Sequence, residues 1–291
     1  MGSDIDHVVQ LLDLEQLEVN LFRGVSPDDD PRERVFGGQV LAQALIAAGR
    51  TVEPDRHVHS LHAYFLLAGD LDAPIVFDVD RIRDGRSFTT RRVVAIQHGQ
   101  AIFNLQASFH VDEPGPEHAD PMPEVPDPES VPVHMRSAFE SGPDGEPQRT
   151  FGPIPGVRPF DQRFVQTPQW MSEPRDANQD VWIRTNGRLA HDALLHAAVI
   201  AYSSDLMLLG TALLPHDQGD RAQAFTRTFM LASLDHAMWF HAPARPDEWL
   251  LYHCHSPVSG AARGFARGEI FRQDGTLCVS IAQEGLVRPR R

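Results

Sequence analysis

The sequence predicts an α+β protein in which one unit, a helix followed by an antiparallel series of strands, occurs twice. Three observations lead to this prediction. The chain has 291 residues, which is enough for two domains of roughly 150 residues each. Helical and strand-like patterns follow one another in the same order in both halves, and a proline-rich segment separates the halves. Such a repeat of element order indicates an internal duplication.

The first half begins its pattern with a helical stretch at residues 40–50. Strands are expected at 75–80, 87–97 and 101–111, with turns at Asp84-Gly85 and His98-Gly99. The last strand has the clearest pattern, because apolar and polar side chains alternate along it with a period of two. One face of this strand is therefore expected to be buried. That face carries Phe103, Leu105, Ala107, Phe109 and Val111.

The second half repeats this order. A helical stretch at 191–209 precedes strands expected at 226–240, 249–255, 263–272 and 276–286. The turn at Asp274-Gly275 favours a hairpin, because glycine tolerates positive φ. A constant offset places Gly99 on Gly275, Arg91 on Arg267 and Phe103 on Val279. One long helix wrapped by a curled antiparallel sheet is the hotdog arrangement, so the expected fold is a tandem hotdog with two such helices.

The segment between the two units is rich in proline. Fourteen of the 23 prolines fall between residues 114 and 174, and the stretch has no sustained periodicity. So long a connection inside a compact protein suggests that it joins two units. The expected organisation is an N-terminal hotdog unit at 1–111, a proline-rich linker at 112–180 and a C-terminal hotdog unit at 181–291.

The composition is ordinary for a globular protein, with 42% hydrophobic and 23% charged residues. The formal net charge of −14 disfavours nucleic acid and anionic lipid surfaces as partners. No secretory signal is recognised at the N-terminus. No apolar run approaches the ~20 residues needed to cross a bilayer. These features predict no nucleic-acid partner, no membrane partner and a cytoplasmic location.

Three polar residues occupy positions that the periodicity assigns to the core. Asp205 lies within roughly 20° of Leu194 around the expected helix. Gln283 shares a strand face with the apolar residues of the last strand, and Ser233 lies on an apolar face that Asp235 also shares. Any one of them could be a hydrogen-bonded core residue. All three together need partners from one another or from a ligand, which indicates a candidate site.

Other chemical groupings in the sequence do not form a recognisable site. Several histidine pairs occur, but none has the spacing of a zinc motif such as HExxH. Cys254 and Cys278 indicate neither a disulfide framework nor a metal knuckle, and they are expected to be small buried side chains. Gly260, Gly264 and Gly268 recur every four residues in a strand context, which indicates close packing. No GxSxG, P-loop or GxGxxG motif occurs, and no metal and no cofactor are predicted.

A series of longer motifs runs along the chain. They are LFRG at 21–24, VFGGQV at 35–40, VHSLHAYFL at 58–66, RDGRSF at 83–88, AYSSDL at 201–206, LDHAMWFH at 234–241, ARGF at 262–265 and QEG at 283–285. In this order they resemble the bacterial acyl-CoA thioesterase II family, whose relatives include the peroxisomal acyl-CoA thioesterases. The resemblance covers nearly the whole chain and is weakest at about 112–180. It implies hydrolysis of fatty acyl-CoA to free fatty acid and CoA.

The resemblance also implies the catalytic residues. The family uses an Asp, a small hydroxyl residue and a Gln, which fall on Asp205, Ser233 and Gln283; Thr is usual at the hydroxyl position in the bacterial members. Asp205 would accept a proton from water, while Ser233 and Gln283 orient that water toward the thioester carbonyl. Our own candidate for an oxyanion donor is a backbone N–H at the Gly37-Gly38 turn. The first helix has no interior carboxylate, so one working centre per chain is expected.

Two other functions stay open on the sequence. A hotdog-fold enoyl-CoA hydratase or dehydratase would prefer an Asp–His pair in one helix, whereas the first histidine after Asp205 is His216. A non-catalytic acyl-CoA-binding module would bind the same ligand without turnover. The family resemblance makes a homodimer or homotetramer the expected assembly. The acyl chain length has no readable pattern, because tunnel depth depends on three-dimensional packing.

Overall fold

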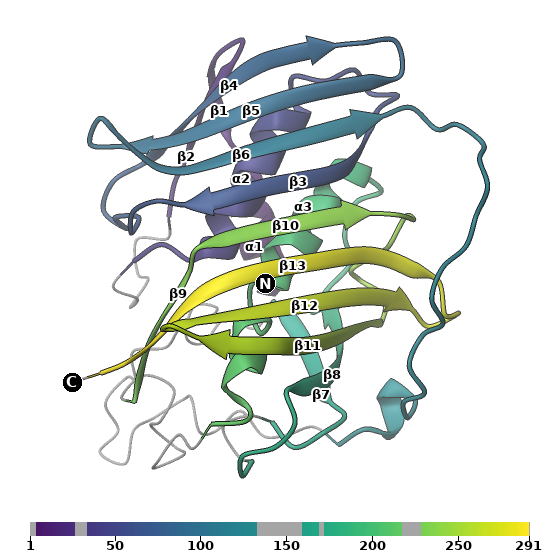
Figure 1. Cartoon of the computed structure of the whole chain (residues 1–291). Coiled ribbons are helices and arrows are strands. Elements are labelled where there is room, and N and C mark those ends of the chain that lie inside the picture. The colour runs from purple at the N-terminus through teal and green to yellow at the C-terminus, as the bar shows by residue number, and fades with distance from the viewer. Residues whose placement is uncertain (1–3, 27–33, 133–158, 169–171, 217–227, 291) are drawn as a thin grey trace.

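A computed structural model of the chain shows helices lying against one face of a long, curled antiparallel sheet (Figure 1). The structure describes residues 4–26, 34–132, 159–168, 172–216 and 228–290. Within these residues the sheet has 13 strands.

The first unit contains one short helix, one core helix and six strands. In chain order they are α1 (Asp4–Leu12), β1 (Glu15–Glu18), β2 (Leu21–Gly24), α2 (Gly37–Gly49), β3 (His57–Phe65), β4 (Ile75–Asp84), β5 (Phe88–Gln97) and β6 (Gln100–His110). The expected helix and the three expected strands are all present. α1, β1, β2 and β3 were not among the expected elements.

The second unit follows the same order after a 3-10 turn, η1 (Pro128–Ser130). Its elements are β7 (Phe160–Phe164), β8 (Asn178–Thr185), α3 (Ala193–Ser204), η4 (Leu209–Leu213), β9 (Phe229–Ser233), β10 (Asp235–Phe240), β11 (Leu250–Gly260), β12 (Arg263–Arg272) and β13 (Leu277–Pro289). The start of the strand expected at 226–240 lies outside the described residues. The described remainder is two strands rather than one, because Leu234 separates β9 from β10.

The two units join edge to edge through β3 and β10, which pair antiparallel with Ala237 opposite His62. The strand order is β1-β2-β4-β5-β6-β3-β10-β13-β12-β11-β8-β7, and β9 pairs with β13 beside this path. Along this path, each strand on one side of the β3–β10 junction has a counterpart at the same distance on the other side. A helix against a curled antiparallel sheet, present twice with approximate twofold symmetry, confirms the tandem hotdog prediction.

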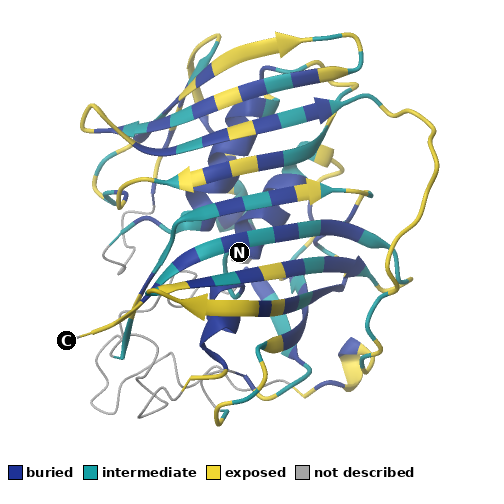
Figure 2. Ribbon diagram, viewed as in Figure 1, coloured by how far each residue is buried: buried dark blue, intermediate teal, exposed yellow. Residues whose placement is uncertain are grey.

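The core helices α2 and α3 pack against each other beneath the sheet, and most of their residues are buried (Figure 2). A Cβ on Gly38 would lie 2.4 Å from the carbonyl oxygen of Tyr202, and one on Gly49 would lie 2.4 Å from the Leu194 side chain. Glycine at both positions therefore allows the close approach of the two helices. Neither helix has a strong polar face, which is typical of helices covered by protein on all sides.

The segment expected as a linker is partly built into the second unit. β7 and the first residues of β8 fall within 112–180, and β7 pairs antiparallel with β8 at the edge of the sheet. Val131 packs with Trp182 and Trp249 in a small cluster on the outer face of the sheet. Residues 133–158 and 169–171 of this segment lie outside the described part. The boundaries of the two units stay a prediction.

The constant offset between the final hairpins is wrong by one residue in their first strands. Arg91 is buried and lies opposite Ala107, whereas Arg267 is exposed. The residue of β12 that lies opposite Gln283 is Ala266. The reason is the turn, which is one residue longer in the second hairpin: Arg272 bonds Thr276 across three residues, whereas Gln97 lies opposite Gln100 across two. The second strands keep the offset, so Ala107 and Gln283 are counterparts.

The expectation that no apolar run nears membrane-spanning length also needs correction. Residues 193–213 form a helical segment that is long and apolar enough to cross a membrane, judged by length and composition alone. Most of its apolar window is buried inside the protein, which is the position of a core helix.

Candidate active site

Asp205 lies at the C-terminal end of α3 rather than within it. The helix expected at 191–209 ends at Ser204, and Asp205 is its C-cap residue, with helical backbone angles. The carboxylate leaves the helix end toward the inner face of the sheet, where strands β9 and β13 present polar side chains. An acidic residue at a helix C-terminus faces the negative end of the helix dipole. The position is therefore unfavourable for a carboxylate unless local donors compensate.

The donors come from the two other residues that the periodicity singled out. Ser233 ends β9 and donates its hydroxyl to Oδ1 of Asp205 at 3.0 Å. Gln283, fully buried in the middle of β13, donates its Nε2 to the same Oδ1 at 2.5 Å and to Oγ of Ser233 at 3.1 Å. The three side chains thus form one closed hydrogen-bonded cluster. The fold brings together residues that are up to 78 positions apart.

A further donor comes from the first unit. The backbone N–H of Gly38, in the first turn of α2, hydrogen-bonds the Asp205 carboxylate. Phe36, the N-cap residue of α2, provides no side-chain cap, so the carboxylate satisfies an otherwise open helix N-terminus. A Cβ on Gly37 would lie 2.6 Å from Oδ2 of Asp205, so this approach requires glycine. The site therefore lies between the two units.

This contact changes the interpretation of the Gly37-Gly38 turn. The turn was expected to supply an oxyanion donor, but its Gly38 N–H is bonded to Asp205 in this structure. Close backbone approach is indeed the role of the glycines. The atom approached is a carboxylate oxygen of the protein.

Burial dominates the electrostatics of Asp205. Desolvation of the carboxylate raises its pKa from 3.8 to about 6, against the opposing effects of the Gln283, Ser233 and Gly38 hydrogen bonds and the charge of Arg34. Part of the residue remains accessible, although the carboxylate itself is almost fully enclosed. A carboxylate with this pKa is ionised at neutral pH and basic enough to accept a proton from water.

Gln283 leaves one polar atom without a partner. Its Oε1 is buried and has no hydrogen-bond partner in the described residues, while both hydrogens of its Nε2 go to Ser233 and Asp205. Burying an unpaired amide oxygen costs on the order of 1–3 kcal/mol. An acceptor of this kind, beside a basic carboxylate, is suited to hold a water molecule.

Asp235, which shares the parity of Ser233 in the sequence, lies outside the cluster. The break at Leu234 separates the two residues, and the Asp235 carboxylate accepts the backbone N–H of Glu284 at 2.7 Å. Arg34 and Phe65 are neighbours of the site that the sequence did not assign to it. Phe65 lies in the motif VHSLHAYFL, and Arg34 immediately precedes VFGGQV.

The remaining chemical groups have local roles. Cys254 and Cys278 are free and buried, as expected. Within the described residues, no group of three histidine, cysteine, aspartate or glutamate side chains could hold a metal ion. His253 is paired with Asp180 at 2.7 Å, which raises the pKa of the imidazole and lowers that of the carboxyl.

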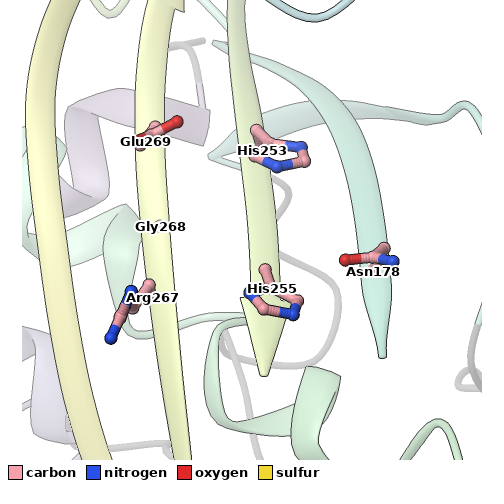
Figure 3. A pocket seen from close by; sticks show the side chains of 6 residues that line it. All are labelled: Asn178, His253, His255, Arg267, Gly268 and Glu269. Carbon is pink, nitrogen blue, oxygen red and sulfur yellow. The ribbon is translucent and has the colours of Figure 1, made fainter. Parts of the chain in front are cut away.

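A polar pocket of about 330 Å³ lies elsewhere, on the outer face of the second unit (Figure 3). Its side chains come from β8, β11 and β12, and they point away from the face that carries Asp205. This pocket lacks the hydrogen-bonded cluster of Asp205, Ser233 and Gln283, and we therefore take that cluster, and not the pocket, as the candidate site. The lining residues are Asn178, His253, His255, Arg267, Gly268 and Glu269.

Comparisons with known proteins bear on the whole chain. Residues 158–286 match the family model described as acyl-CoA thioesterase, and residues 26–110 match an acyl-CoA thioesterase N-terminal domain. Acyl-coenzyme A thioesterase 8 of Mus musculus is 42% identical over 97% of this chain and 88% of its own length.

Solved structures agree with this assignment. Acyl-CoA thioesterase II TesB2 from Mycobacterium marinum is 42% identical, with a TM-score of 0.79 over 97% of this chain and 98% of that one. A hot dog fold protein from Alicyclobacillus acidocaldarius, 19% identical, has a TM-score of 0.76 over 98% of this chain and 99% of that one, which supports the fold.

Proposed function

Because this chain belongs to the acyl-CoA thioesterase family, we propose that it hydrolyses fatty acyl-CoA with a water molecule held by Asp205, Ser233 and Gln283. The observation that carries the assignment of these residues is their closed hydrogen-bonded cluster around a desolvated carboxylate.

In the proposed reaction, Asp205 is the general base. A water molecule donates one hydrogen bond to the carboxylate and the other to Oε1 of Gln283, the acceptor that lacks a partner. Asp205 takes a proton as the water oxygen bonds to the thioester carbonyl carbon. The C–S bond then breaks, and the departing sulfur receives that proton from the Asp205 carboxyl. The products are a fatty acid and the free thiol of CoA.

Ser233 and Gln283 position the base in this mechanism. Both donate to Oδ1 of Asp205, which restricts the carboxylate to one orientation. Fixing the reacting groups before the reaction lowers the entropic part of the barrier. The pKa of Asp205 near 6 places its proton affinity close to neutral pH, where a general base works best.

The two alternative functions are not favoured. A hydratase that uses an Asp–His pair would need a histidine on Asp205, whereas its side-chain partners in the described residues are Ser233 and Gln283. A binding module has no need of a carboxylate whose ionisation costs free energy. Thiol release separates the thioesterase from both alternatives, because neither a hydratase nor a binding module liberates CoA.

The decisive test measures thiol release from a series of acyl-CoA chain lengths. We expect turnover for wild type and a loss of about 10²–10⁴-fold in kcat for Asp205→Asn. The matched control is Asp235→Asn, in which the amide oxygen can still accept the Glu284 N–H, and it should retain activity. An active Asp205→Asn enzyme would refute the site. No thiol release by the wild type at any chain length would refute the function.

Two finer expectations are part of the proposal. A homodimer or homotetramer is expected from the family resemblance, and light scattering on the purified chain tests it. A cytoplasmic location is the second, and fractionation of the source cells with detection of the native chain tests it.

A further inference from the structure

The residue that precedes Asp205 is held on both sides by neutral side chains of the sheet. Ser204 ends α3, and its Oγ lies 2.9 Å from Nε2 of His236 in β10. Its carbonyl oxygen accepts the hydroxyl of Tyr252 in β11 at 2.9 Å. Ser204, His236 and Tyr252 are all buried. We call this set the Ser204 clamp.

The hydrogen bonding of Ser204 assigns the tautomer of His236. The Ser204 hydroxyl also lies 2.9 Å from the carbonyl oxygen of Ala201, one turn back in α3. If the hydroxyl hydrogen goes to that carbonyl, Nε2 of His236 carries a proton and donates to Oγ. The opposite tautomer would place a hydrogen on Nδ1, which is buried and has no partner in the described residues. An unpaired buried N–H is rarer than an unpaired acceptor.

Tyr252 reaches Ser204 only because the next strand leaves space for its ring. A Cβ on Gly268 of β12 would lie 2.4 Å from the Tyr252 ring. The carbonyl that Tyr252 binds belongs to the last turn of α3, where carbonyl groups have no partner within the helix. The glycine at 268 therefore serves this contact.

The first unit has a clamp of the same design but of different charge. Thr51, just beyond α2, bonds through Oγ1 to the Ala48 carbonyl at 2.8 Å, as Ser204 does one turn back. Its Oγ1 accepts Nε of Arg91 at 2.8 Å, and its carbonyl accepts a second Arg91 nitrogen at 2.9 Å. In the first unit one guanidinium thus performs both contacts. In the second unit, two uncharged side chains perform them.

The residue after the clamp explains the difference. Val52 follows Thr51, whereas Asp205 follows Ser204. A guanidinium beside Asp205 would attract its negative charge and favour the ionised form, making the carboxylate a weaker base. Of the groups around Asp205, Arg34 is the charged side chain that acts on it in the described residues. Burial lowers the pKa of His236 to about 3 and raises that of Tyr252 well above 10, so both clamp residues are neutral at physiological pH.

From this geometry we infer that His236 and Tyr252 are positioning residues of the hydrolytic reaction, which fix the Asp205 carboxylate through Ser204 without placing a charge beside it. The inference rests on the proposed function, since it assigns these residues to the same site.

The test compares variants of His236 by steady-state thiol release. His236→Leu puts an apolar side chain in this buried position and removes the Nε2 donor to Ser204. We expect kcat to fall about tenfold, with KM within twofold of wild type. His236→Gln carries an amide nitrogen near the position of Nε2, so it should recover most of the loss. The matched control is His62→Leu, which should behave as wild type. His62 is an exposed histidine of β3 that lies opposite Ala237 of β10.

Two further variants keep the test decisive if His236→Leu does not fold. Ser204→Ala removes the hydroxyl that receives the His236 hydrogen bond, and Tyr252→Phe removes the bond to the Ser204 carbonyl. In each variant we expect kcat to fall while KM changes less. A circular dichroism spectrum that matches wild type shows that the variant is folded. Wild-type kcat in folded Ser204→Ala and Tyr252→Phe would overturn the inference.

A pH profile separates positioning from general destabilisation. In His236→Gln the acid limb of kcat/KM should stay near that of wild type, whereas His236→Lys, if folded, should move it to lower pH. An unmoved limb in a folded lysine variant would contradict the role of neutrality. If the wild type releases no thiol, the proposed function fails, and if Asp205→Asn is active, the proposed site fails. If Asp205→Asn is inactive and the clamp variants are unaffected, only this inference fails.

Discussion

The two units share one backbone design, but only the second carries the polar cluster. The clamps and the strand registers align the units residue by residue, since Thr51 corresponds to Ser204 and Ala107 to Gln283. Val58 lies opposite Phe109 as Ser233 lies opposite Gly285. The first-unit counterparts of the three site residues are Val52, Val58 and Ala107.

Under the proposed function, one scaffold serves stability in one copy and chemistry in the other. The first unit uses apolar side chains at these positions and places the buried Arg91 at its helix end, with Asp84 as ionic partner. The second unit replaces the arginine by the small Ala266 opposite Gln283 and accepts the cost of a desolvated carboxylate. Functional sites often depart from optimal packing in this way, at a cost in stability.

We expect the largest effect from a substitution in the first unit, which lowers the free energy of unfolding. Arg91→Met leaves two acceptors of the buried Thr51, Oγ1 and the carbonyl oxygen, without this donor and removes the bond to the exposed Asp84. At about 1–3 kcal/mol for each buried acceptor, we expect the free energy of unfolding to fall by about 3–5 kcal/mol. The kcat of the folded fraction should not change. Urea unfolding followed by circular dichroism measures the first quantity. The exposed neighbour Arg92→Met is the control, with an expected change below about 1 kcal/mol; equal effects in both variants would contradict the structural role of Arg91.

The next effect is on catalysis in the second unit. Gln283→Ala removes two hydrogen bonds and the acceptor for water, and we expect kcat to fall about a hundredfold. Steady-state thiol release gives the value. The control is Gln106→Ala. Gln106 is an exposed residue of β6 next to Ala107, the counterpart of Gln283, and its replacement should leave kcat unchanged. Full activity in Gln283→Ala would mean that the partnerless Oε1 has no role in the reaction.

At one pH unit below the pKa of Asp205, we expect kcat/KM to be about tenfold lower than at neutral pH. Only the ionised carboxylate accepts a proton, and burial raises its pKa to about 6. We therefore expect kcat/KM to be nearly constant above pH 7 and to fall about tenfold for each unit below pH 6. A pH profile of thiol release at subsaturating acyl-CoA tests this. An acid limb centred near pH 4 would show that the carboxylate is hydrated in solution.

The smallest expected effect is that of the hydroxyl residue. Ser233→Thr keeps the donor to Asp205 and adds a methyl group at a partly exposed position, so kcat should stay within about threefold of wild type. Ser233→Ala removes the donor and should cost about tenfold in kcat, or roughly 1.4 kcal/mol. Both values come from the same thiol assay. If the alanine variant matches the threonine variant, Ser233 does not position the base.

Much of the fold follows from local sequence patterns. The period-2 alternation of β6 and the apolar helices predicted the repeated order of elements, because burying one face of a sheet requires that pattern. Short strands such as β1 and β2 escaped prediction, since four residues are too few to show a period. Residues 160–164 fall in the expected linker because prolines lie on both sides of them, and only their pairing at the sheet edge makes them the strand β7.

The sequence by itself determined which residues break the apolar pattern, and so it singled out Asp205 and Gln283 as core-facing polar groups. It placed Ser233 and Asp235 on one face, and only the break at Leu234 separated them. Tertiary structure also decided the partners: Gly38 approaches from the other unit, and His236 and Tyr252 reach the helix end from two strands. The physical reason is that periodicity encodes the direction of a side chain along its own element. Hydrogen bonds between elements depend on register and packing distance, which are set when the chain is folded.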